Sequence, residues 1–202
     1  MIDRHNVTVF SCLFHCSEYA WVMIKPMKPI LFLDFDRTLF DTDKFYEWLG
    51  EKRFERILSI TGGRLPPPDF SSYVFADAIS FLKKIKPHYR AVILTYSLNT
   101  ILQKMKIKGS GLLPYVHDVI VTQRGKGEQA KDYLEHIGLL KGHHFFIDDA
   151  PINIEEMKQS NLHVTSIRIE RTPIAKEDMK GITVAPDAVI KDLAGAEKFL
   201  EI

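Results

Sequence analysis

Cysteine is scarce in this chain, which has only Cys12 and Cys16 among its 202 residues. Both precede the apolar segments from which a core could be built, so the sequence argues against a disulfide scaffold and suits a reducing, cytoplasmic location. Cys12, His15 and Cys16 supply too few ligands at this spacing to predict a metal site.

An excess of one charge and a long uninterrupted apolar run are lacking as well. Lys and Arg number 27 against 26 Asp and Glu, a net charge of +1, so no nucleic-acid partner is expected. The most apolar stretch, residues 7–24, carries His15 and Glu18 near its middle, whereas a membrane helix needs about 20 mostly apolar residues. We therefore expect no membrane partner.

The chain is long enough for one α/β domain with a real core, which we place at residues 28–202. Residues 1–27 are expected to be a dispensable extension, because Met27 stands just ahead of the first apolar segment and could be the true translation start. The sequence does not indicate an oligomeric state.

Short apolar segments alternate with helical patterns, which predicts an α/β fold with a doubly wound parallel sheet. We expect strands at residues 30–35, 91–95, 117–122, 144–147 and 163–169, with an edge strand at 188–190. Helical spacing of apolar residues predicts helices over 74–85, 98–105, 126–137, 151–157 and 193–200.

The interval 43–72 is extra relative to a bare β-α-β unit and predicts a small helical cap. Its apolar residues fit one or two short helices that end at Gly62 and Gly63. They could line a substrate pocket, but we favour packing because such side chains bury strongly. These apolar residues are Phe45, Trp48, Leu49, Phe54, Ile57 and Leu58.

Two carboxylates, Asp34 and Asp36, follow the first predicted strand, in the sequence Asp-Phe-Asp-Arg-Thr. The carboxyl edge of such a sheet is where open α/β folds bind ligands. We interpret Asp34 as a nucleophile that attacks phosphorus and Asp36 as the acid/base that protonates the leaving alcohol. Mg²⁺ would screen their repulsion from a phosphate. The plainer alternative is that both are ordinary strand-end aspartates.

Further polar residues follow the later strands. Thr95 and Tyr96 end the second strand, Lys126 lies between two glycines before a helix, and Asp148 and Asp149 end the fourth strand. Each has a structural alternative: a strand threonine, a solvated lysine or a capped helix start. Together with the Asp34–Asp36 pair these residues form four motifs, and the shared order and placement of the motifs argue against coincidence.

This order of acid pair, hydroxyl, lysine and acid pair resembles the haloacid dehalogenase (HAD) superfamily of phosphatases and phosphotransferases. The matching motifs span residues 34–153, more than half of the chain. The resemblance implies a Rossmann-like core with Asp34 as nucleophile and Asp36 as general acid/base.

The resemblance also implies ligand roles. Thr95 and Lys126 would bind the phosphoryl group, and Tyr96 beside Thr95 is a further candidate for substrate binding. Mg²⁺ would be held by Asp34, by the Asp36 carbonyl oxygen, by Asp148 and, directly or through water, by Asp149.

The chain departs from the family pattern at one point, because Ile152 stands where many relatives have another acid. Asn153 is the nearest polar substitute. Arg124 and Lys131 could replace Lys126, but we prefer Lys126 because flanking glycines would let the backbone approach a ligand. The lysines at 104, 106 and 108 are interpreted as a solvated helix surface.

The function predicted from these motifs is a Mg²⁺-dependent phosphatase of the HAD-like type, acting on a small phosphorylated metabolite through an aspartyl-phosphate. A phosphotransferase or a protein phosphatase of the same fold stays open, as does a non-catalytic phosphate-binding regulatory module. Which phosphomonoester is bound cannot be told from the sequence.

Overall fold

The structure is a computed structural model that describes residues 27–172 and 179–202. The extension expected at residues 1–27 lies almost wholly outside the described residues, so its dispensability stays a prediction. Among the helices that the structure describes, none has the length and apolar character needed to cross a membrane.

A parallel sheet of six strands forms the centre of the protein, in the order β3-β2-β1-β4-β5-β6. The order reverses between β1 and β4, which lie side by side with Leu33 opposite Ile147. The strands are β1 (Ile30–Leu33), β2 (Arg90–Tyr96), β3 (Asp118–Thr122), β4 (His144–Asp148), β5 (Val164–Ile169) and β6 (Ala188–Ile190).

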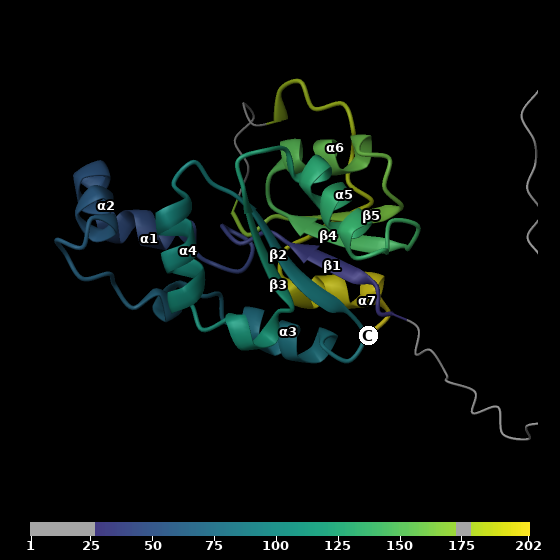
Figure 1. Cartoon of the computed structure of the whole chain (residues 1–202), viewed down its shortest axis with the longest axis horizontal. Coiled ribbons are helices and arrows are strands. Elements are labelled where there is room, and N and C mark those ends of the chain that lie inside the picture. Colours follow the sequence, from purple (N-terminus) through teal and green to yellow (C-terminus); the bar gives the residue numbers. More distant parts are fainter. Residues whose placement is uncertain (1–26, 173–178) are drawn as a thin grey trace, which may run out of the picture.

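Helices cover both faces of this sheet (Figure 1). In that view α5 and α6 lie on one face, α3 and α7 lie on the other, and α1 and α2 extend to the left. The α-helices are α1 (Thr42–Leu49), α2 (Arg53–Thr61), α3 (Ala78–Ile85), α4 (Thr100–Gly109), α5 (Lys126–His136), α6 (Pro151–Gln159) and α7 (Glu197–Leu200). Short 3₁₀ turns span Phe70–Tyr73, Leu113–Tyr115 and Leu193–Ala196.

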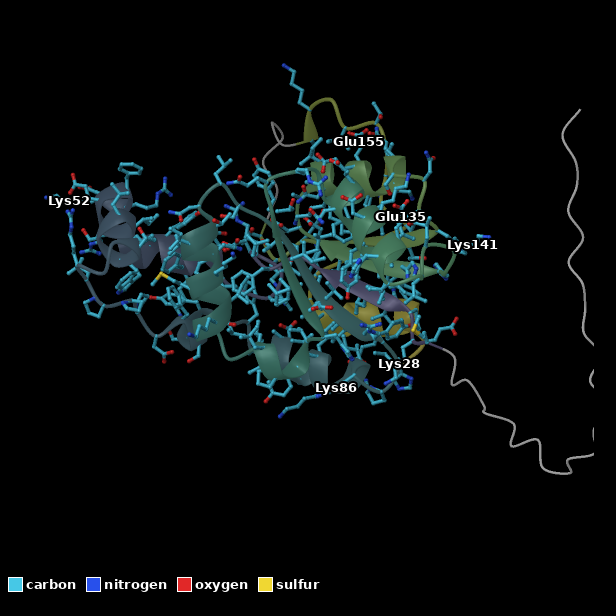
Figure 2. All side chains as sticks on the ribbon, in the orientation of Figure 1. Lys28, Lys52, Lys86, Glu135, Lys141 and Glu155 are labelled. Carbon is cyan, nitrogen blue, oxygen red and sulfur yellow. The ribbon has the colours of Figure 1, made fainter. Side chains whose placement is uncertain are left out.

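The strands read as continuous apolar runs because both of their faces are buried. In β1, Leu31 and Leu33 pack into the core shared with α3, α4 and α7, while Ile30 and Phe32 pack into the core shared with α5 and α6. This doubly covered parallel sheet confirms the predicted fold class. Charged side chains such as Lys52, Lys86 and Lys141 lie at the periphery (Figure 2).

The predicted strand positions are confirmed to within two residues at each end. The largest difference is at β1, which ends at Leu33 because Phe35 already accepts the turn hydrogen bonds from Leu39 and Phe40. The helix predicted from residue 74 begins only at Ala78, since Val74 pairs as an isolated bridge with Phe40. The last predicted helix is a 3₁₀ turn followed by the short α7.

The interval 43–72 holds most of α1, all of α2 and an extended return to the 3₁₀ turn. The packing interpretation holds for Phe45 and Leu49, which are fully buried. It is wrong for three residues that the structure leaves exposed. These are Trp48 at 42%, Phe54 at 74% and Leu58 at 53% exposure.

Candidate active site

Four segments meet at the carboxyl edge of the sheet, where β1 adjoins β4. Asp34 directly follows β1, Asp148 ends β4, Thr95 lies near the end of β2, and Lys126 is the first residue of α5. Ligands of open α/β folds bind at such a reversal of strand order.

A buried lysine joins the two acid motifs. The Lys126 Nζ binds an Asp34 carboxylate oxygen and lies 2.6 Å from Asp148 Oδ2. All three side chains are at most 5% exposed. Burial alone would lower the pKa of Lys126, but Asp148 and Asp34 outweigh burial and raise it. The lysine is therefore a fixed cation between two carboxylates.

Three carboxylates gather beside this lysine. Asp34, Asp148 and Asp149 each offer an oxygen atom, and these atoms lie within 4.8 Å of one another. Burial raises the pKa of Asp34 well above its ordinary value; Lys126 opposes the shift, and the neighbouring acids add to it. Burial, followed by the charge of Asp148, raises the pKa of Asp149 to about 7. One lysine does not balance this much negative charge, and oxygen donors of this kind fit Mg²⁺.

Residues at the start of helix α6 orient the Asp148 carboxylate. Its Oδ1 accepts hydrogen bonds from the Ala150 backbone N–H at 2.8 Å and from Asn153 Nδ2 at 2.9 Å. Asn153 thus fixes Asp148 through its amide, while Ile152 is half exposed. The polar substitute noted in the sequence lies at the site, as a partner of an acidic residue.

Asp36 lies in a different environment from Asp34. Its carboxylate accepts hydrogen bonds from Thr42 Oγ1 at 2.5 Å and Gln103 Nε2 at 2.6 Å, and it pairs with Lys106. Burial would raise the pKa of Asp36, but Lys106 and these hydrogen bonds together lower it. The predicted metal contact through its carbonyl oxygen stays a prediction.

The sequence interpretation missed Thr42, Gln103 and Lys106. The expectation of a solvated lysine surface is correct for residues 104 and 108 and wrong for Lys106, whose side chain is only 3% exposed. Residues two apart on a helix do not share a face, whereas Gln103 and Lys106 are three apart and do. This three-residue spacing was the one feature of the sequence that could have indicated that Gln103 and Lys106 act together.

Thr95 and Tyr96 differ in burial and in their contacts. Thr95 is buried and its hydroxyl accepts a hydrogen bond from Gln103 Nε2 at 2.9 Å. Tyr96 is 46% exposed, and strand alternation points it to the other face of the sheet. The structure brings Thr95 together with Asp36 and leaves Tyr96 outside this network.

Gly127, beside Lys126, has a role in helix packing. A Cβ atom on Gly127 would lie 2.4 Å from the Glu156 carbonyl oxygen, so this glycine allows α5 to pack against α6. The Glu156 carboxylate also accepts a hydrogen bond from the Lys126 backbone N–H at 3.0 Å. Close packing of the two helices therefore requires glycine at position 127, and the approach of the backbone to a ligand stays a prediction.

The two cations that could have replaced Lys126 lie elsewhere. Arg124 is exposed and binds Glu128 and Asp132 on the outer surface of α5. Lys131 is exposed further along the same helix. Only Lys126, among these three, contacts the acid motifs.

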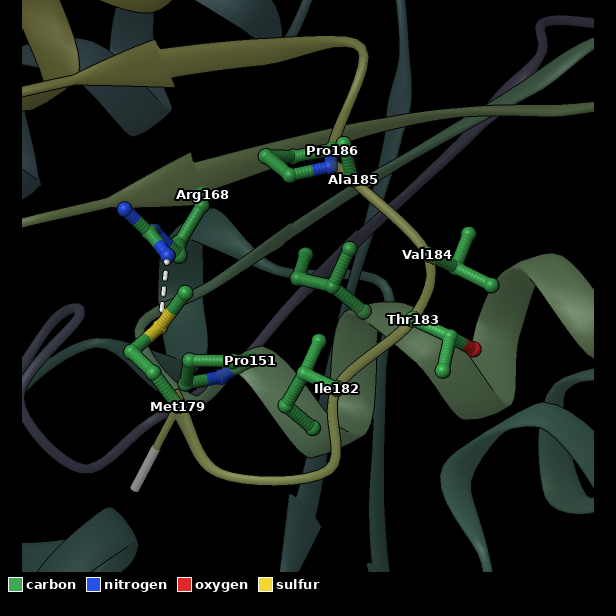
Figure 3. Close-up of a pocket in the computed structure, with 9 residues that line it drawn as sticks. Pro151, Arg168, Met179, Ile182, Thr183, Val184, Ala185 and Pro186 are labelled. Carbon is green, nitrogen blue, oxygen red and sulfur yellow. Dashed lines mark hydrogen bonds between the residues drawn. The ribbon is translucent and has the colours of Figure 1, made fainter. Parts of the chain in front are cut away.

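A separate cavity of about 320 Å³ lies beside α6 (Figure 3). Pro151, Ile154 and Arg168 line it, together with Met179 and residues 182–186. The Arg168 guanidinium contacts Glu170 and the sulfur of Met179. None of the site carboxylates described above lines this cavity, so it is distinct from the candidate active site.

Comparison of the fold with solved structures identifies its class. A HAD phosphatase from Thermococcus onnurineus superposes with a TM-score of 0.56 at 22% identity, over 86% of this chain and 98% of that one. L-2-haloacid dehalogenase from Xanthobacter autotrophicus superposes with a TM-score of 0.59 at 17% identity, over 87% of this chain and 99% of that one. A candidate HAD-hydrolase, YfnB of Bacillus subtilis, bound to magnesium, superposes with a TM-score of 0.61 at 14% identity, over 87% of this chain and 99% of that one.

The protein has the fold of the HAD-like hydrolases, which confirms the expected resemblance at the level of fold. No protein-family model and no curated protein matches the chain. The solved structures of this fold include a phosphatase and a dehalogenase, so the fold alone does not choose between these reactions.

Proposed function

We propose that this protein is a Mg²⁺-dependent phosphatase that hydrolyses a small phosphomonoester through an aspartyl-phosphate intermediate. The observation that carries the proposal is the pair of carboxylates in two environments. Asp34 lies in the charged cluster with Lys126, and Asp36 is held apart by Thr42, Gln103 and Lys106. Asp34 lies in the carboxylate cluster, where Mg²⁺ would favour its ionised, nucleophilic form, and Asp36 lies outside that cluster as a separate group to carry the proton.

The first half of the reaction uses both acids. The contacts of Asp36 lower its pKa, so Asp36 takes up a proton when the substrate binds, and a monoanionic phosphomonoester is a source of it. An Asp34 oxygen then attacks phosphorus, the bond from phosphorus to the ester oxygen breaks, and Asp36 gives this proton to the departing alkoxide. Lys126 and the Thr95 hydroxyl would neutralise and orient the phosphoryl oxygens. Asp34, Asp148 and Asp149 would hold Mg²⁺, which supplies charge stabilisation for the phosphoryl group when bound.

The second half regenerates the enzyme. Asp36, now a carboxylate, accepts a proton from water, the water oxygen attacks phosphorus, and the bond between phosphorus and Asp34 breaks. The products are inorganic phosphate and free Asp34. Asp36 keeps 29% exposure, which leaves it open to water and to a leaving group.

Asp36 favours this chemistry over dehalogenation. A halide leaves without taking a proton, so displacement of halide does not need a second acid. Removal of an alkoxide does need one, and general acid catalysis contributes about 10²–10⁴-fold to such steps.

The proposal is tested with a panel of phosphomonoesters in Mg²⁺, with released phosphate as the readout. Asp34→Asn should abolish turnover, Asp36→Asn should lower it, and EDTA should abolish it reversibly. Asp132→Asn is the matched control, because Asp132 is an exposed acid that pairs with Arg124 away from the site. Turnover that persists in Asp34→Asn would refute the covalent route.

The dehalogenase alternative is tested in ¹⁸O-labelled water. In the proposed route water attacks phosphorus, so the label enters phosphate. Hydrolysis of an ester formed by Asp34 with a haloacid carbon would instead put the label into the Asp34 carboxylate if water attacks the carboxyl carbon. Halide release from 2-haloacids, with label in the Asp34 peptide, would replace the phosphatase assignment.

A further inference from the structure

Helix α4 presents two buried polar side chains to Asp36. Gln103 is 2% exposed and the Lys106 side chain is 3% exposed, whereas Lys104 and Lys108 on the same helix are exposed. Burial of a lysine costs free energy that packing alone does not return, so its partners decide what it does.

These two side chains fix both oxygens of one carboxylate. Lys106 Nζ binds Asp36 Oδ1, and Gln103 Nε2 donates to Asp36 Oδ2 at 2.6 Å. Thr42 Oγ1 also donates to Oδ1, at 2.5 Å. A carboxylate that accepts from three side chains, with both of its oxygens engaged, is held in one orientation.

The same Gln103 amide also orients Thr95. Its Nε2 donates to Thr95 Oγ1 at 2.9 Å, so the threonine oxygen acts there as an acceptor. The Thr95 hydrogen is then left to donate to another acceptor, such as a phosphoryl oxygen. One side chain thereby connects the acid/base carboxylate to the hydroxyl at the end of β2.

Aromatic rings surround the Lys106 ammonium. Its Nζ lies 5.4 Å from the ring centroid of Phe35, 5.1 Å from that of Phe40 and 5.9 Å from that of Phe45. Cation–π attraction and restricted water access both hold the ammonium in place against Asp36. A buried ion pair is weak evidence for stability as such, because apolar residues of similar size often serve as well.

We propose that Lys106 and Gln103 are positioning residues, which hold Asp36 in the orientation from which it protonates the leaving group and aim the Thr95 hydroxyl at the phosphoryl group. The proposal rests on the phosphatase function above. It extends the site to α4, a helix to which the four sequence motifs assign no role.

A positioning role predicts a loss that depends on the leaving group. An alkyl phosphate needs a proton on its departing oxygen, whereas p-nitrophenyl phosphate releases a stable phenolate without one. The measurement is kcat/KM, which covers the transfer to Asp34 and excludes the later attack of water. Lys106→Met should lower kcat/KM for an alkyl phosphomonoester by about 100-fold, within the range of general acid catalysis. For p-nitrophenyl phosphate we expect less than about 10-fold.

Two further variants complete the test. Lys106→Arg keeps the cation and should recover part of the lost activity on the alkyl substrate. Gln103→Met removes the bonds to Asp36 and Thr95 together, so both substrates should lose activity. Lys108→Met is the matched control, because it removes an exposed lysine from the same helix, and it should match the wild type on both substrates.

The outcomes separate this inference from the proposed function. Suppose that the wild type turns over both substrates. If Lys106→Met then lowers kcat/KM by the same factor for both, or leaves kcat/KM unchanged for both, the positioning role is wrong while the phosphatase function stands. A wild type that is silent on every phosphomonoester overturns both. If Lys106→Met fails to fold by circular dichroism, the same comparison is made with Lys106→Gln.

Discussion

Removal of the buried cation should destabilise the protein far more than removal of Asp34, one of the two acids with which it pairs. In Lys126→Met the carboxylates of Asp34 and Asp148 stay buried and lose their shared partner. Breaking a buried pair in this way costs about 3–5 kcal/mol. In Asp34→Asn the Lys126–Asp148 pair remains, and we expect a cost below about 1 kcal/mol.

The assay is urea unfolding in EDTA, repeated with Mg²⁺. The metal binds the folded state and should raise its stability by about 2.7 kcal/mol at 100 times Kd. Because Mg²⁺ and Lys126 neutralise the same carboxylates, the gain should be largest for Lys126→Met, intermediate for the wild type and smallest for Asp34→Asn. Equal stability of Lys126→Met and the wild type in EDTA, or the reverse order of the Mg²⁺ effect, would refute this reasoning.

Three other changes test helix packing, acid stability and the N-terminal extension. Gly127→Ala should destabilise the protein by about 1–3 kcal/mol in urea, because its Cβ would lie 2.4 Å from the Glu156 carbonyl oxygen; an unchanged midpoint contradicts the packing of α5 on α6. Asp187 has a lowered pKa because hydrogen bonds from Lys158 and from β5 outweigh burial. The contribution of Asp187 to the free energy of unfolding is therefore present above the unfolded pKa of about 3.9 and is lost as pH falls through the lower folded pKa. Asp187→Asn should therefore flatten the acid side of the stability curve between about pH 5 and pH 2, and an unaltered curve contradicts this. A chain that starts at Met27 should keep full solubility and phosphatase activity, and loss of either shows that the extension is needed.

The carboxyl ends of the strands were predictable because their chemistry is local. An apolar strand that ends in a charged residue can be buried only if the charged residue lies at the edge of the sheet. Asp34 and Asp148 therefore share an edge once their strands are parallel neighbours. The lysine between them was predicted from its place at the start of a helical pattern and from the resemblance to the HAD superfamily.

The role of α4 was not predictable from its own residues. Ile101 and Met105 are apolar and one turn apart, yet Ile101 is 59% exposed, while Gln103 and Lys106 are buried. Which face of a helix turns inward depends on what the neighbouring elements offer. Here Asp36 and the rings of Phe35, Phe40 and Phe45 offer a polar and cation-binding surface.

The sequence by itself determined the class of fold, the positions of the strands and the residues at their carboxyl ends, because apolar runs and their polar ends are set by neighbours in the chain. The tertiary structure alone decided that Lys106 and Gln103 hold Asp36, that Thr95 joins this network without Tyr96, and that Gly127 serves helix packing. Those contacts join segments up to 70 residues apart. Their strength comes from burial, which exists only after the segments have folded together.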